Sequence, residues 1–78
     1  MLSEIALRLL GDARAALLAA EKEIRQGSAM AAESLSKAWQ DVLHASKNEE
    51  ILHEGETVYL FMEYDRLQRK LSRSESSL

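Results

Sequence analysis

"LLGDARAALLAAEKEIRQGS", residues 9 to 28, contains most of one amphipathic helix and the turn that ends it. Apolar residues recur every three or four positions along one side of this helix: Leu2, Ile5, Ala6, Leu9, Ala13, Ala16, Leu17, Ala20 and Ile24. Ser3 can cap its start, and Arg25 followed by Gly27 is typical of a helix end. We expect a helix over about residues 4–26, and the short Gly–Ser turn makes the next helix an antiparallel neighbour.

Two further helices are expected downstream. Ser28 is positioned to cap a second helix over about residues 29–48, and Thr57 to cap a third over about residues 57–71. The apolar stripe of the second helix is Ala31, Leu35, Ala38, Val42 and Ala45, widened by Trp39 and Leu43. The stripe of the third helix is Leu60, Tyr64, Leu67 and Leu71. The sequence leaves open whether the second helix extends through residues 49–54.

The composition favours long helices with few interruptions. Proline and cysteine are absent and glycine occurs three times in 78 residues. Without cysteine, the chain has no disulfides and no thiolate metal sites. After Leu71 the sequence SRSESSL is polar and serine-rich, so we expect residues 72–78 to form a flexible tail. The sequence therefore predicts an all-α fold, a small antiparallel three-helix bundle over residues 1–71 with a disordered C-terminal tail.

Length and charge limit the possible partners. A chain this short buries a limited fraction of its surface, so we expect self-association or a protein partner. The formal net charge of −3 at pH 7 gives no bulk attraction to nucleic acid. The longest run of small residues is too short to cross a membrane. The N-terminus lacks the basic region, apolar stretch and cleavage site that follow one another in a signal peptide. We expect a cytoplasmic protein with no membrane span and no nucleic-acid partner.

The sequence offers little that could support catalysis. It contains no glycine-rich phosphate loop, no Gly-x-Ser-x-Gly elbow and no carboxylate pair spaced for a cleft. Glu50 and His53 have the Glu-x-x-His spacing that helix bundles use in duplicate to bind two metal ions, but one copy is too few. His44 fits an ordinary polar position at the edge of the second helix. We expect no enzyme activity, no catalytic residue, no metal site and no cofactor.

The third helix carries more large apolar residues than one face can hold. Residues 59–64 read YLFMEY, and with Val58 they cover almost two turns, so Phe61 or Met62 must point away from the core. Aromatic and methionine side chains suit a partner groove because they repack and offer a large contact area. The predicted partner-binding residues are Trp39, Phe61, Met62 and Tyr64, with Leu18 as a further outward candidate.

Three segments spread over about residues 5–71 resemble a known family. They are the quoted stretch, LSKAWQDVL at residues 35–43 and GETVYLFMEYDRLQRKL at residues 55–71. Together they resemble the middle three helices of the flagellar export chaperones of the FliS type. The nearest matches are the pair Tyr64-Asp65 with the basic Arg69-Lys70-Leu71 after it, the Leu35 and Ala38 pattern, and Leu9-Leu10-Gly11-Asp12. The resemblance implies a cytoplasmic antiparallel bundle that holds the disordered C-terminal segment of flagellin until secretion.

A second resemblance covers some of the same residues. GDARAALLAAEKEIRQGS with AWQDVLHASKNEEIL resembles the IIA proteins of the lactose and cellobiose phosphotransferase systems. Those are three-helix proteins, usually trimeric, that carry phosphate on a histidine of the third helix. Met62 or a neighbour stands where that histidine would be, and residues 57–71 contain no histidine. This resemblance supports a three-helix fold and argues against phosphate transfer as the activity.

The leading prediction is a non-enzymatic helical binding module. In its most specific form it is a small secretion chaperone or adaptor, of the flagellar or type III kind, that holds an amphipathic helix of a client protein. One alternative is a structural homo-oligomer whose exposed apolar residues form a symmetric subunit interface. Another is an inactive bundle related to the phosphocarriers.

Overall fold

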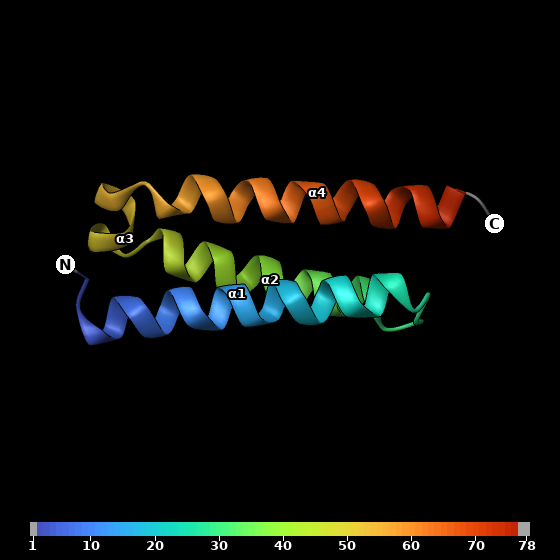
Figure 1. The fold of residues 1–78 in the computed structure, drawn as a ribbon, viewed down its shortest axis with the longest axis horizontal. Helices are drawn as coiled ribbons and strands as arrows, with labels where there is room; N and C mark the ends of the chain where they lie inside the picture. Colours follow the sequence, from blue (N-terminus) through green and yellow to red (C-terminus); the bar gives the residue numbers. More distant parts are fainter. Residues whose placement is uncertain (1, 77–78) are drawn as a thin grey trace.

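The computed structural model describes residues 2–76, and every regular element in that range is a helix. In chain order these are α1 (Glu4–Arg25), α2 (Ala31–Ser46), α3 (Glu49–Glu54) and α4 (Glu56–Ser76). The three long helices lie side by side and alternate in direction, while α3 sits at the end where α2 gives way to α4 (Figure 1). The predicted all-α antiparallel bundle is confirmed, with overall dimensions of 45 by 17 by 14 Å.

Local hydrogen bonds define both ends of α1. The Ser3 hydroxyl oxygen accepts a hydrogen bond of 3.2 Å from the Ala6 N–H, so the predicted cap is confirmed. At the other end Gly27 has φ of 64°, a left-handed conformation that glycine adopts without steric cost. The N–H of Ser28 donates to the Glu23 carbonyl at 3.0 Å and the N–H of Gly27 to that of Ile24 at 3.1 Å. These two bonds form a Schellman motif, which turns the chain back on itself.

The start of α2 differs from the prediction. The helix begins at Ala31 rather than near residue 29, and its cap residue is Met30, which makes no side-chain capping bond. Ser28 instead closes the preceding turn, since its hydroxyl oxygen accepts from the Met30 N–H at 3.0 Å. Predicting Ser28 as the helix cap was therefore wrong, because a turn closed by the Ala31 N–H on the Ser28 carbonyl, at 3.1 Å, separates Ser28 from α2.

The connection between α2 and α4 forms a separate short helix. Asn48 begins it by accepting hydrogen bonds at its side-chain oxygen from the N–H groups of Glu50 and Ile51, at 3.0 and 3.3 Å. Gly55, with φ of 77°, ends it, and α4 follows at once. Thr57 lies buried inside the first turn of α4, so its predicted role as the cap was wrong. The second helix does not continue through residues 49–54, because Asn48 interrupts it.

The core between α1 and α2 is built on a seven-residue repeat. Its buried side chains are spaced alternately four and three apart: Ala6, Leu10, Ala13, Leu17, Ala20 and Ile24 on α1, and Ala31, Leu35, Ala38, Val42 and Ala45 on α2. Alanine recurs at every seventh position. Because its side chain is small, the axes of the two helices can approach to the shorter end of the usual range of about 8–10 Å. Ile5, which was predicted in the core stripe, is 71% exposed because the repeat selects its neighbour Ala6 instead.

Helix α4 completes the bundle by packing against both partners. Leu60 and Leu67 are fully buried, whereas Tyr64 and Leu71 are half-buried and pack against the edge of the core. The helix continues through Ser76, so the expected tail is helical up to that residue, and residues 77 and 78 lie outside the described range. Within residues 2–76, none of the helices is long and apolar enough to cross a lipid bilayer.

Candidate binding groove between helices α2 and α4

An aromatic cluster joins α2 to α4. Trp39 projects from α2 between two rings of α4, with its ring centre 5.5 Å from that of Phe61 and 4.6 Å from that of Tyr64. The contact with Phe61 is edge-on, at 62° between ring planes, and the contact with Tyr64 is tilted at 37°. Phe61 and Tyr64 both contact the ring of Trp39, because residues three apart in the sequence are neighbours on a helix surface. The structure thus brings together three of the four predicted binding residues.

Met62 and Leu18 lie elsewhere. Met62 is 67% exposed and is separated from the aromatic cluster by the helical rotation of about 100° per residue. Leu18, on α1, is 66% exposed and lines a hollow between α1 and α4 together with Tyr59. These two residues therefore belong to a different surface from the aromatic cluster.

A groove extends from the aromatic cluster along the line between α2 and α4. It is an open hollow of about 330 Å³ lined by Ala32, Leu35, Ser36, Trp39, Tyr64, Gln68, Leu71 and Ser72. We call this surface the α2–α4 groove. The Tyr64 hydroxyl donates a hydrogen bond of 3.2 Å to the side-chain oxygen of Gln68, which holds the tyrosine ring in place along α4. The floor is apolar and the rim residues Ser36 and Gln68 are polar but uncharged.

Ion pairs bridge α1 and α4 instead. Arg14 pairs with Glu56 at 3.1 Å, and Arg66 pairs with Glu21 at 2.8 Å, so each pair links the two helices. The hydrogen bond from Arg66 holds the pKa of Glu21 below its ordinary value, and the positive charge of Arg66 acts in the same direction. Among the described residues no ion pair links α2 to α4. A partner in the α2–α4 groove would therefore not have to displace an interhelical ion pair.

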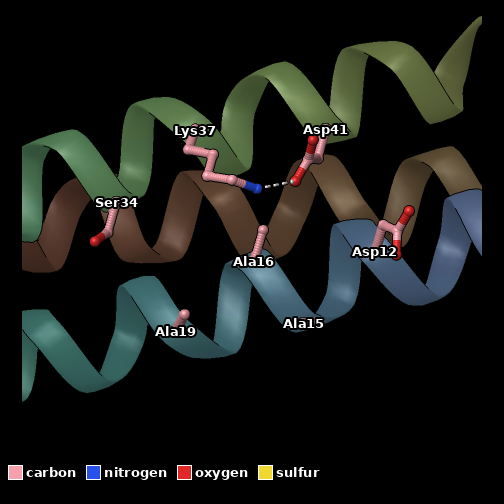
Figure 2. Close-up of a pocket in the computed structure, with 7 residues that line it drawn as sticks. All are labelled: Asp12, Ala15, Ala16, Ala19, Ser34, Lys37 and Asp41. Atoms are coloured by element: carbon pink, nitrogen blue, oxygen red, sulfur yellow. Dashed lines mark hydrogen bonds and ion pairs between the residues drawn. The ribbon is translucent and has the colours of Figure 1, made fainter.

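Another open hollow lies between α1 and α2, on the side away from α4. Figure 2 shows its floor of alanines on α1 and, on α2, Lys37 reaching along the helix to Asp41. The hollow measures about 520 Å³, and the Lys37 ammonium lies 3.0 Å from the Asp41 carboxylate. No large apolar side chain lines it, so it lacks the anchors that dominate binding energy in protein interfaces. The α2–α4 groove is the stronger candidate for a binding site.

Glu50 of the predicted half-motif takes part in a structural contact. Its carboxylate accepts a hydrogen bond of 2.8 Å from the Ser3 N–H, and this bond lowers the pKa of Glu50. The contact ties α3 to the start of α1. His53 and His44 are exposed. In the part of the chain that the structure describes, no three histidine or acidic side chains gather closely enough to bind a metal ion.

Sequence reasoning missed most of the groove lining. Gln68 and Leu71 follow Tyr64 by four and seven positions, and Ser36 precedes Trp39 by three, so helical spacing alone extends the surface to them. To predict this surface, one must know that Trp39 and Tyr64 face each other from two different helices. That depends on how each helix is rotated about its own axis.

No family model, no curated protein and no solved structure matches this chain. The fold, the groove and the charges on the helices are therefore the basis for a functional proposal.

Proposed function

We propose that this protein is a non-enzymatic helical binding module that holds the apolar side of an amphipathic helix in the α2–α4 groove. The observation that carries the proposal is the groove itself, where the half-buried side chains of Trp39, Tyr64 and Leu71 lie within an uncharged rim. Its most specific form is a cytoplasmic secretion chaperone or adaptor of the flagellar or type III kind. That form is supported only by the resemblance of the sequence to the flagellar export chaperones.

The shape of the groove suits a helix better than a small molecule. It is open to solvent and follows the direction of two antiparallel helices, so a third helix can lie along it with apolar residues at every third or fourth position. Covering half-buried aromatic and aliphatic carbon contributes roughly 25 cal/mol for each Å² removed from water. Tyrosine and tryptophan are also enriched among the residues that dominate binding energy.

The test is a titration of intrinsic fluorescence with the C-terminal segment of a flagellin. Trp39 is the only tryptophan in the sequence and lies in the groove, so its emission reports directly on occupancy. We expect a saturable spectral shift. Absence of a shift with folded protein would contradict a flagellar client.

A matched pair of substitutions locates the binding surface. Ser36→Glu places a carboxylate on the rim of the groove, and because that charge must lose water on binding, we expect at least a tenfold weaker affinity, about 1.4 kcal/mol. Ala19→Glu adds the same charge at an exposed position of α1 outside the groove, and should leave the affinity unchanged. Equal affinities for the two variants would contradict binding in the α2–α4 groove.

A further inference from the structure

Helices α1 and α4 together present a second apolar surface, on the other side of α4 from the groove. Leu18, Tyr59 and Met62 are 66%, 53% and 67% exposed. Leu18 and Tyr59 line one hollow of about 130 Å³, and Met62 lies one turn along α4 from Tyr59. A hollow of about 150 Å³ holds a benzene ring, so this one is of the size that a large apolar side chain fills. We call these three residues the apolar centre of the α1–α4 face.

Five charged side chains surround the apolar centre, and one of them, Glu63, lines its hollow and pairs with Arg66 at 2.9 Å. The other four are arranged in two pairs. On the side toward α3, Arg14 of α1 lies next to Glu56 of α4, and on the other side Glu21 lies next to Arg66. Along α1 the order is positive then negative, and along α4 it is negative then positive. When such a face is turned end over end and laid on a copy of itself, Arg14 meets Glu21 and Glu56 meets Arg66. The arrangement is thus complementary to itself.

The charge of the whole molecule favours the same arrangement. Glu49, Glu50 and Glu56 lie at the α3 end of the bundle, and the far end of α4 carries Arg69, Lys70 and Arg73. Figure 1 shows these two regions at opposite ends of the long axis. An antiparallel copy places the acidic end of one molecule beside the basic end of the other.

We propose that the α1–α4 face binds a second copy of this chain, antiparallel and related by a twofold axis, with the two apolar centres packed together. A long face of this molecule measures 45 by 17 Å, which is on the order of the ~800 Å² that each partner buries in a stable interface. The dimer covers the exposed Leu18, Tyr59 and Met62. It leaves the α2–α4 groove open, so this inference and the proposed function stand or fall separately.

Sedimentation equilibrium over a range of concentrations tests the dimer with the full chain. We expect a reversible dimer, and Leu18→Glu and Met62→Glu should each raise its dissociation constant at least tenfold. Both positions are exposed, so the fold should survive, and circular dichroism checks this. Ile5→Glu is the control, because Ile5 is 71% exposed on the other flank of α1 and should leave the dimer intact. A monomer at all concentrations, or a dimer that both face variants leave unchanged, overturns the proposal.

Charge exchange tests the antiparallel arrangement. The double variant Arg14→Glu with Glu56→Arg keeps a pair within the chain but brings like charges together in an antiparallel dimer. The double variant Glu21→Arg with Arg66→Glu brings like charges together from the other side. It also removes the pairs of Glu21 with Arg25 and of Arg66 with Glu63 within the chain, so circular dichroism checks that it folds. We expect each variant to dimerise weakly alone and the two to form a heterodimer when mixed, because opposite charges then meet again. Homodimers as tight as the original in both variants would overturn the antiparallel face.

Discussion

Phe61 and Met62 are adjacent in the sequence and lie on different surfaces of α4. Phe61 contacts the ring of Trp39, while Met62 is 67% exposed and lies outside the aromatic cluster. Both were predicted to bind a partner in one groove, because the sequence shows that the helix carries surplus apolar residues and does not show how the helix is rotated. A single angle, the orientation of α4 about its own axis, decides which surface each side chain joins.

This difference predicts unequal effects on stability. Phe61→Ala removes a half-buried ring from the aromatic cluster, so we expect the free energy of unfolding to fall by about 1–3 kcal/mol. Met62→Ala removes an exposed side chain and should change it by less than about 0.5 kcal/mol. Urea unfolding followed by circular dichroism measures both. Equal losses would contradict the assignment of the two residues to different surfaces.

Two glycines give a second prediction at this scale. Gly27 has φ of 64°, where a side chain clashes with the backbone, so Gly27→Ala should destabilise the protein by about 1–2 kcal/mol. Gly11 lies within α1, and a Cβ added there would meet no atom within 4 Å, so Gly11→Ala should stabilise it by up to about 1 kcal/mol. Thermal unfolding of the two variants should shift in opposite directions. Stabilisation by Gly27→Ala would contradict the left-handed turn at Gly27, and destabilisation by Gly11→Ala would contradict the open space around Gly11.

Among the elements, the long helices could be predicted from local pattern, and the connections could not. The stripe from Ala31 to Ala45 was predicted residue for residue, because periodic apolar positions depend only on the geometry of one helix. The caps Ser28 and Thr57 were misplaced, because α2 begins after Met30, which makes no side-chain capping bond, and α4 begins at Glu56, directly after Gly55. A prediction that looks for a polar cap residue does not find helix starts of this kind.

The alanine repeat between α1 and α2 predicts sensitivity to added volume. Ala13 is fully buried, so Ala13→Leu should force the helices apart and cost about 1–3 kcal/mol. Ala15→Leu makes the same change at an exposed position of α1 and should cost less than about 0.5 kcal/mol. Chemical denaturation compares them, and a similar cost for both would show that the helices are not closely packed at Ala13.

The contact between α3 and α1 predicts a dependence on pH. The bond from the Ser3 N–H lowers the pKa of Glu50 in the folded state, so its contribution to stability is complete above the ordinary pKa of glutamate, about 4.3. The contribution is lost as the pH falls through the lowered value. Glu50→Gln should therefore destabilise the protein at neutral pH, and the difference from the original chain should vanish in acid. A destabilisation by Glu50→Gln that persists unchanged in acid would contradict this role of the Ser3 contact.

For the whole molecule, the number and direction of the long helices followed from the sequence, whereas the surfaces between them did not. Short turns force consecutive helices to be antiparallel, and this is a local property of the chain. The pairing of Trp39 with Tyr64, or of Arg66 with Glu21, joins residues far apart in the sequence. Such pairs depend on how three helices rotate relative to one another, which no single segment determines.

The separation of charge along the molecule predicts a response to salt. Attraction between the acidic and basic ends of an antiparallel pair extends over about 10 Å at 0.1 M salt and about 3 Å at 1 M. We expect the dissociation constant of the dimer, measured by sedimentation, to rise several-fold over that range. The packing of the two apolar centres should still hold part of the protein as a dimer at 1 M salt. A dimer that tightens steadily with salt would indicate apolar packing without the charge pairing.

The alanine repeat has one more consequence, for the alignment of α1 with α2. Small and large buried residues alternate with a period of seven on both helices. If one helix slid past the other by seven residues, roughly 10 Å, each alanine would therefore move into the position of the next alanine, and the packing would look the same. The core alone therefore permits more than one register. The Schellman turn at Gly27 leaves too little chain for the shifted pairing, so the connection, rather than the core, holds the information that selects a single register.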